Sequence, residues 1–137
     1  MKGTIDEDML ISHDVYIIDN VTVNSNVTLT IGPGCRIKFN NGKYIKVFGN
    51  IYANGEEGKP IIFTSPNPNP SPGDWYGMVF EDGGEIELNH ARVEYATYGV
   101  KSSYADVELR NSEFARNGRD CRMQSCNGTY RSFHLSA

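Results

Sequence analysis

The stretch EIELNHARVEYATYGV begins at Glu85, and a similar stretch, DVELRNSEFARNGRDC, begins 21 residues later at Asp106. At that offset the apolar positions of the two stretches coincide: Ile86 with Val107, Leu88 with Leu109, and Val93 with Phe114. A repeat this short is typical of a solenoid, in which each coil buries its inward side chains against those of the next coil. The repetition therefore predicts that these two stretches lie in adjacent, touching coils.

The rest of the chain consists of short segments rich in β-branched and aromatic residues, separated by Gly, Asn, Asp or Pro. Many of them alternate between apolar and polar residues, as strands do. No window shows the apolar spacing of an amphipathic helix over three turns. We therefore expect an all-β protein without substantial α-helix, with strands at 26–31, 35–39, 43–48, 50–53, 60–65, 75–80, 85–88 and 91–96.

Each coil of about 21–22 residues has room for three short strands. A second repeat agrees with this period, because Tyr76-Gly77-Met78 recurs 22 residues later as Tyr98-Gly99-Val100. Stacked parallel strands lie about 4.8 Å apart, so equivalent residues of successive coils form ladders. The sequence thus predicts a parallel β-helix in which Tyr76 lies over Tyr98. Outward ladders should pair Glu85 with Asp106 and Glu87 with Glu108.

Composition limits the functional classes. A chain of 137 residues is the size of one domain, and its net charge of −4 argues against a nucleic-acid partner. No apolar run is long enough to span a membrane, and the first residues, MKGTIDEDML, do not form a signal peptide. The odd set of cysteines (Cys35, Cys121 and Cys126) favours two free thiols and one core thiol, although Cys121 and Cys126 could form a local disulfide.

Four further elements occur in a fixed order: Leu29-Thr30-Ile31 with Pro33-Gly34, then Val47-Phe48-Gly49-Asn50-Ile51, Pro60-Ile61-Ile62-Phe63-Thr64, and Trp75-Tyr76-Gly77. This order resembles the opening coils of secreted or cell-surface right-handed parallel β-helix proteins of the pectate-lyase-like superfamily. The resemblance covers about residues 15–118. Together with the right-handed rule for parallel crossovers, it implies a right-handed helix. It also implies an extracellular or cell-surface parent protein.

We interpret residues 1–137 as a single β-helix domain with three parts. Residues 1–20 are expected to form an N-terminal cap, and residues 21–118 are expected to form the coils. The segment 119–137 departs from the repeat and is either a divergent last coil or a truncated end. An open end of a β-helix exposes unpaired backbone groups, so self-association through that end is a possible interaction.

The proline-rich stretch SPNPNPSPGD (65–74) is the main departure from short turns. Alternating prolines stiffen the backbone, so this loop should stand away from the coils and present the residues that follow it. Aromatic faces beside polar groups suit sugar rings. The candidate carbohydrate-binding residues are Asp74, Trp75, Tyr76, Tyr98 and Tyr104. The alternative for Trp75 is that it packs the loop onto the coils, and the tyrosines could be ordinary strand residues.

The acidic ladder of Glu85, Glu87, Asp106 and Glu108 is a second candidate site. Carboxylates one strand spacing apart could share protons in glycosidic-bond chemistry or bind Ca²⁺. The alternative is that outward glutamates keep a solenoid soluble and prevent sideways pairing of its sheets. We expect no cofactor, apart from that calcium alternative, and no transition-metal site.

The expected function is therefore a non-catalytic structural or adhesive β-helix module, with polysaccharide as a possible ligand. The alternative is the N-terminal part of a polysaccharide lyase or glycoside hydrolase acting on acidic polysaccharide. A lyase needs a base and cations that neutralise a uronate carboxylate. The available cations are Arg92, Lys101, Arg110, Arg116 and Arg119, but no spacing among them selects a catalytic set.

Overall fold

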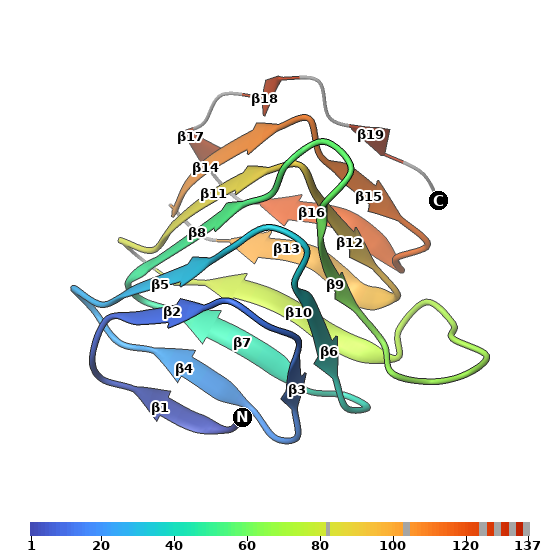
Figure 1. The fold of residues 1–137 in the computed structure, drawn as a ribbon, viewed down its shortest axis with the longest axis horizontal. Helices are drawn as coiled ribbons and strands as arrows, with labels where there is room; N and C mark the ends of the chain where they lie inside the picture. The colour runs from blue at the N-terminus through green and yellow to red at the C-terminus, as the bar shows by residue number, and fades with distance from the viewer. Residues whose placement is uncertain (82, 103–104, 124–125, 128–129, 132–133, 136–137) are drawn as a thin grey trace.

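The computed structural model describes residues 1–81, 83–102, 105–123, 126–127, 130–131 and 134–135. Within these ranges the chain forms strands and no helix, which leaves no helical segment that could cross a membrane. The strands belong to three sheets, and from β1 to β17 consecutive strands along the chain belong to different sheets (Figure 1).

From β1 to β17 each sheet contains every third strand of the chain, and all strand pairs within the sheets are parallel. Sheet A contains β1 (Gly3–Ile5), β4 (Val21–Val23), β7 (Tyr44–Val47), β10 (Trp75–Phe80), β13 (Ala96–Ser102) and β16 (Arg119–Met123). Sheet B contains β2 (Met9–Ile11), β5 (Thr28–Ile31), β8 (Asn50–Asn54), β11 (Glu85–Asn89), β14 (Ala105–Arg110), β17 (Cys126–Asn127) and β18 (Tyr130–Arg131). Sheet C contains β3 (Val15–Ile17), β6 (Arg36–Phe39), β9 (Ile61–Thr64), β12 (Ala91–Glu94), β15 (Glu113–Ala115) and β19 (His134–Leu135).

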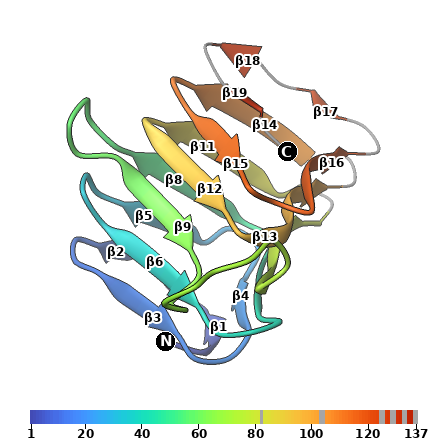
Figure 2. The same cartoon turned by 90° about the vertical axis from the view of Figure 1, so that its right-hand side faces the viewer.

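Three strands complete one turn, so the strands from β1 to β15 make five turns, and β16 begins another. Figure 2, turned by 90°, shows the strands of sheet C stacked in chain order from the N-terminal end upward. The all-β parallel β-helix predicted from the repeat is confirmed, and it is consistent with the right-handed sense that the resemblance and the crossover rule implied.

The register of sheets B and C is the one that the repeat predicted. Between β11 and β14, Ile86 pairs with Val107 and Leu88 with Leu109, while Glu85 and Glu87 pair with Asp106 and Glu108. Between β12 and β15, Val93 pairs with Phe114. The 21-residue period thus reports direct contact between neighbouring coils.

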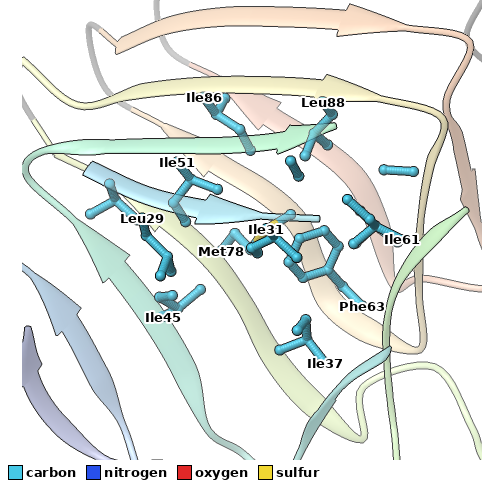
Figure 3. Packing of buried hydrophobic residues seen from close by; sticks show 14 of the residues in the cluster. Leu29, Ile31, Ile37, Ile45, Ile51, Ile61, Phe63, Met78, Ile86 and Leu88 are labelled. Atoms are coloured by element: carbon cyan, nitrogen blue, oxygen red, sulfur yellow. The ribbon is translucent and has the colours of Figure 1, made fainter. Parts of the chain in front are cut away.

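Inward side chains form apolar ladders along the axis of the helix. Leu29, Ile51 and Ile86 lie in register on β5, β8 and β11, and each is at most 1% exposed. Figure 3 shows that these ladders from different sheets meet in one continuous core. Burying an aliphatic side chain of this size contributes about 1.5–3 kcal/mol, so stacked coils stabilise one another.

The first strands extend the helix rather than forming a separate structure below it. Strands β1, β2 and β3 pair in parallel with β4, β5 and β6, so residues 1–20, the expected cap, cover the core as a coil of their own. Met1 packs against the core from this end. Strands β16 to β19 lie in the segment 119–137, whose side chains are outside the described part of the structure.

Cys35 is buried in this core and has no disulfide partner. Burial raises the pKa of its thiol, and the nearby Asp14 carboxylate raises it further. This agrees with the interpretation of Cys35 as a core thiol. The side chains of Cys121 and Cys126 are outside the described part, so their pairing stays a prediction.

Candidate functional site

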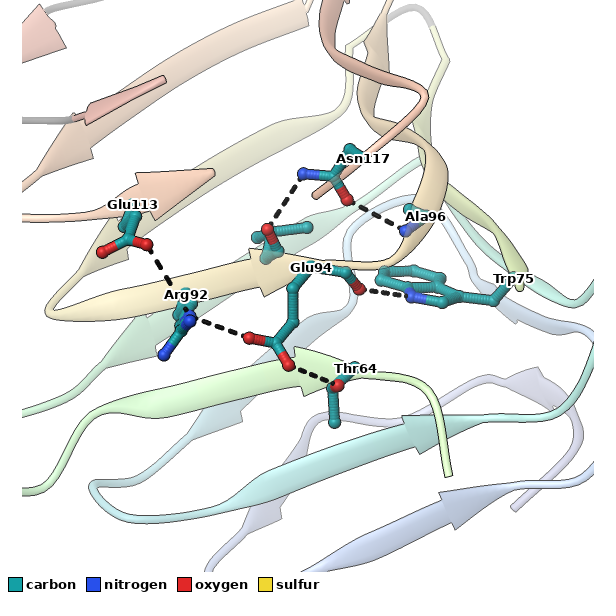
Figure 4. Close-up of polar contacts among 8 residues, drawn as sticks. Thr64, Trp75, Arg92, Glu94, Ala96, Glu113 and Asn117 are labelled. Carbon is teal, nitrogen blue, oxygen red and sulfur yellow. Dashed lines mark hydrogen bonds and ion pairs between the residues drawn. The ribbon is translucent and has the colours of Figure 1, made fainter. Parts of the chain in front are cut away.

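Trp75 does not offer its ring to a ligand, because the side chain is completely buried. Its ring stacks on Phe39 with 4.0 Å between the ring centroids and 8° between the planes. Its indole N–H donates a hydrogen bond of 2.8 Å to the carbonyl oxygen of Glu94 (Figure 4). The expectation that Trp75 stacks on sugar is therefore corrected, and its alternative role, packing the chain after the loop, is the observed one.

Polar contacts hold the coils together around this tryptophan (Figure 4). The Glu94 carboxylate accepts a 2.8 Å hydrogen bond from Thr64 on the coil below and forms an ion pair with Arg92. On the coil above, the side-chain oxygen of Asn117 accepts a 2.9 Å hydrogen bond from the backbone N–H of Ala96. The buried polar side chains of Thr64 and Asn117 are thus hydrogen-bonded to neighbouring coils, which gives this corner a structural role.

Asp74 organises the loop that precedes Trp75, which projects from the body between β9 and β10 (Figure 1). Its Oδ2 atom accepts hydrogen bonds from Ser65 (2.8 Å), Asn67 (2.9 Å) and the Ser71 N–H (3.1 Å). Burial acts to raise the pKa of Asp74, but these three hydrogen bonds outweigh it and hold the pKa below its ordinary value. The carboxylate that we expected to contact sugar therefore has a clear role in fixing the loop.

Three tyrosines line up on the outer face of sheet A. Tyr76 contacts Tyr44 at 6.3 Å and Tyr98 at 5.6 Å between ring centroids, with interplanar angles of 72° and 70°. These edge-to-face contacts are a favourable arrangement for aromatic rings. The structure thus brings the predicted pair Tyr76 and Tyr98 together and adds Tyr44. The remaining predicted tyrosine, Tyr104, lies outside the described residues.

The register of the tyrosines differs by one residue from the prediction. Tyr98 and Tyr44 both pair with Gly77, and a β-bulge between Gly77 and Met78 shifts the later pairs, so that Met78 faces Val100. The predicted offset of 22 residues is therefore correct from Met78 onward, but it is wrong at Tyr76, which does not pair with Tyr98. A bulge adds one residue to one strand and redirects its side chains, and here Tyr76 meets Tyr98 at an angle.

Two lysines accompany the tyrosines. The ammonium of Lys101 lies 5.1 Å from the ring centroid of Tyr98, and it donates a 2.9 Å hydrogen bond to the hydroxyl of Tyr76. The ammonium of Lys46 lies 5.5 Å from the ring centroid of Tyr44. In sheet A, Lys46 and Lys101 both pair with Val79, so they lie in one outward ladder. The site thus combines aromatic rings with cations.

These residues surround a hollow of about 450 Å³ on sheet A, which we call the tyrosine groove. Its lining consists of Gly42, Tyr44, Lys46, Tyr76, Val79, Phe80, Glu81, Lys101 and Ser102. Tyr98 borders it through its contacts with Tyr76 and Lys101. The volume lies within the range of small-ligand sites, and the mixture of aromatic faces, hydroxyls and charges suits sugar rings.

Ser102 belongs to the wall of the groove but faces the core. It pairs with Phe80, which pairs with Val47, and both of those side chains are at most 1% exposed. The Ser102 hydroxyl is buried without a hydrogen-bond partner among the described residues. Because a buried hydroxyl without a partner is unfavourable, Ser102 lowers the stability of the core at this position.

The acidic ladder exists as a register, and its three described carboxylates have different neighbours. Glu85 and Glu87 lie near Tyr52. Burial is the largest cause of the raised pKa of the Tyr52 hydroxyl, and the negative charges of Glu85 and Glu87 raise this pKa further. Glu108 forms an ion pair with Arg110. The side chain of Asp106 is outside the described part. Among the side chains that are described, no three His, Cys, Asp or Glu lie together as metal ligands would.

Sequence reasoning missed Tyr44 and Lys46, and it treated Lys101 only as one of several cations. Tyr44 pairs with Gly77, 33 residues later, whereas Gly77 pairs with Tyr98 after 21 residues. The longer first interval contains the 65–74 loop, which hides the repeat between the third and fourth coils. Removing that loop before aligning the coils would have placed Tyr44 in the ladder.

Comparison with known protein families matches residues 3–107 to the family described as pectate-lyase like beta helix domain. No match was found among curated proteins or solved structures. The matched segment covers more than half of the chain and includes β1 to β13, which carry the tyrosine groove. This match supports a polysaccharide-related β-helix module, and the chain belongs to the pectate-lyase-like β-helix family.

Proposed function

We propose that this chain is a non-catalytic polysaccharide-binding module of an extracellular or cell-surface protein, and that the tyrosine groove contacts the polymer. The observation that carries the proposal is the row of Tyr44, Tyr76 and Tyr98, half-buried and in contact with one another across three coils. A row of rings that follows the helix axis suits a linear polymer, because successive sugars can stack on successive coils.

Binding is favoured over catalysis by the state of the polar groups. Glu108 is paired with Arg110, and Asp74 accepts hydrogen bonds from its own loop. These contacts hold the groups in place, which suits recognition of a ligand. Groups that transfer protons must instead meet the reacting atoms of the substrate.

The test is retardation of the purified chain in native gels that contain plant, algal or microbial polysaccharides. Tyr76→Ala and Tyr98→Ala should each weaken binding to a retarding polymer by about fivefold, the value of one aromatic contact of about 1 kcal/mol. Tyr16→Ala is the matched control, because Tyr16 is 47% exposed on β3 of sheet C, away from the groove. Equal retardation of Tyr98→Ala and the unsubstituted protein would contradict the proposal.

One observation favours the alternative, in which the chain contributes to a lyase acting on acidic polysaccharide. The amine of Lys101 and the hydroxyl of Tyr76 lie 2.9 Å apart in the groove, and both groups can carry a proton. Incubation with a retarding uronate polymer, followed by measurement of the ultraviolet absorbance of unsaturated products, distinguishes the two. Absorbance that rises with the unsubstituted protein and not with Lys101→Met would support the lyase.

A further inference from the structure

The first coil of the helix has open strand edges. Strands β1 and β2 are terminal members of sheets A and B, and each has a strand neighbour on one side only among the described strands. The carbonyl groups of Ile5 and Ile11 accept hydrogen bonds from the second coil. Because the backbone groups of a strand alternate between its two sides, the preceding residues, Thr4 and Leu10, direct their N–H and C=O groups away from that coil. The edge of β3 is different, since the backbone of Met1 bonds to it.

Apolar side chains gather in the same coil. Five large apolar side chains are exposed in the described part of the chain, and four of them lie in residues 1–20: Met9, Leu10, Tyr16 and Ile18. Met9 pairs with Leu29, which is 1% exposed, so Met9 continues an inward ladder, yet it is itself 38% exposed. A further layer of strands below the first coil would cover Met9. Clustered apolar surface of this kind marks a contact with another molecule.

The two ends of the helix carry opposite charges. Residues 1–20 contain one lysine and five exposed carboxylates: Asp6, Glu7, Asp8, Asp14 and Asp19. Residues 119–137, the segment of β16 to β19, contain three arginines and one aspartate. Figures 1 and 2 show β1, β2 and β3 at one end of the helix and β17, β18 and β19 at the other. The acidic end of one copy therefore attracts the basic end of another, whereas two acidic ends repel one another.

The register of the stacked strands fits such a contact. The ladder that starts at Ile5 runs through the paired residues of sheet A to Met123. In sheet B, the ladder that starts at Ile11 ends at Tyr130. A second copy that continues both ladders places Met123 of one copy next to Ile5 of the other, and Tyr130 next to Ile11. Apolar or aromatic residues then meet in both sheets, and the strands of the two copies run parallel, as they do within one copy.

We propose that copies of this chain associate end to end, with the acidic first coil of one copy on the last strands of the next. The partner is thus a second copy, and the contact adds strand pairs to sheets A and B. This inference goes beyond the proposed function and does not depend on it. Because the two contacting surfaces differ, the contact does not close on itself, so stacks of copies grow with protein concentration.

The experiment is sedimentation velocity of the purified chain over a series of concentrations. The mean mass should rise continuously with concentration and pass the mass of a dimer. Leu10→Pro removes an N–H group from the open edge, and the Leu10 side chain is 67% exposed, so the substitution removes little buried surface. It should weaken association at least about fivefold, the value of one hydrogen bond. Urea unfolding of the variant checks that it is folded.

The role of charge is tested by a variant that leaves the strands unchanged. Glu7→Lys reverses an exposed charge in the turn between β1 and β2 and should weaken association about threefold. The matched control is Glu57→Lys, which makes the same change at an exposed residue between β8 and β9 and should leave association unchanged. Equal effects of the two variants would show that net charge, and not the acidic end, governs association, and would overturn the inference.

A mixture shows which ends meet. A Leu10→Pro copy keeps its last strands, so it should bind the first coil of an unsubstituted copy and stop the stack there. Labelled Leu10→Pro should therefore cosediment with unsubstituted protein and lower the number of unsubstituted copies per stack. A mean mass that stops at the dimer, without such cosedimentation, overturns the end-to-end arrangement in favour of two first coils in contact. A chain that stays monomeric at every concentration overturns self-association, and the open edge then belongs to a partner of another kind.

Discussion

Replacing Gly77 with alanine tests the register that builds the tyrosine groove. Gly77 pairs with Tyr98 directly before the register shift between β10 and β13, and its backbone φ is +139°. A Cβ atom at this position would lie 1.9 Å from the carbonyl oxygen of Tyr98. The backbone of Tyr98 on the neighbouring strand thus occupies the space that an alanine side chain would need.

The expected cost follows from two separate effects. The backbone conformation of Gly77 is one that residues with a Cβ adopt only with strain of about 1–3 kcal/mol. The contact of 1.9 Å must also grow beyond 3.0 Å, the distance below which Cβ contacts essentially do not occur. Since the contacted atom is backbone, this shift separates β10 from β13 and loses about two ladder hydrogen bonds, worth about 1 kcal/mol each. The total destabilisation is about 3–5 kcal/mol.

The assay is urea-induced unfolding followed by circular dichroism, with Gly58→Ala as the matched control. Gly58 has a φ of +83°, and nothing lies within 4 Å of its missing Cβ, so that variant carries backbone strain without a collision. It should lose about 1 kcal/mol. The difference between Gly77→Ala and Gly58→Ala isolates the collision and should exceed about 2 kcal/mol. Equal free energies of unfolding for the two variants would refute the register at Gly77.

Three further predictions concern the core and the loop. Ser102→Ala removes a buried hydroxyl without a described partner and should raise the free energy of unfolding by about 1 kcal/mol. Ser112→Ala loses two hydrogen bonds and should lower the free energy of unfolding by about 1 kcal/mol. Urea titration of both variants measures these changes. Asp74→Asn should lower the free energy of unfolding by about 1 kcal/mol at pH 7. Because the pKa of Asp74 in the folded protein lies below its ordinary value of about 4, the carboxylate contributes fully above that value, and the contribution is lost as the pH falls through the folded pKa. The free energies of unfolding of the variant and the unsubstituted protein should therefore differ at pH 7 and approach one another toward pH 3. Trp75→Phe should lower the free energy of unfolding by about 2 kcal/mol, because the hydrogen bond to Glu94 and some buried area are lost. Its affinity for a retarding polysaccharide should stay within about twofold of the unsubstituted value. A folded Trp75→Phe protein without affinity would contradict the purely structural role of the indole.

The fold was predictable because its determinants repeat. The inward positions of the fourth and fifth coils face one another directly, so the same apolar alternation recurs wherever two coils touch. A ladder such as Ile51 over Leu29 and under Ile86 places a buried apolar side chain at every level. Periodicity in the sequence therefore reports contact in the structure, without any knowledge of individual side-chain positions.

The site was only partly predictable because its determinants do not repeat. Whether an aromatic ring faces a ligand or the core depends on single residues, and Trp75 and Tyr76 are adjacent yet have opposite environments. The bulge at Gly77 changes the register by one residue, which no repeat length can show. The role of Asp74 depends on three partners within its own loop, and only the folded loop brings them together.

The outward ladder through Lys46, Val79 and Lys101 shows how a β-helix can accommodate two charges of the same sign. Adjacent lysines in such a ladder would lie about 4.8 Å apart and repel one another. Val79 lies between them in register, so their strands are two spacings apart, about 9.6 Å. That distance exceeds the screening length of about 8 Å at physiological ionic strength, so the repulsion is weak before a ligand arrives. The tyrosines provide each ammonium with a nearby ring in the meantime. The groove can therefore hold two cations, although no ion pair with Lys46 or Lys101 is found among the described residues.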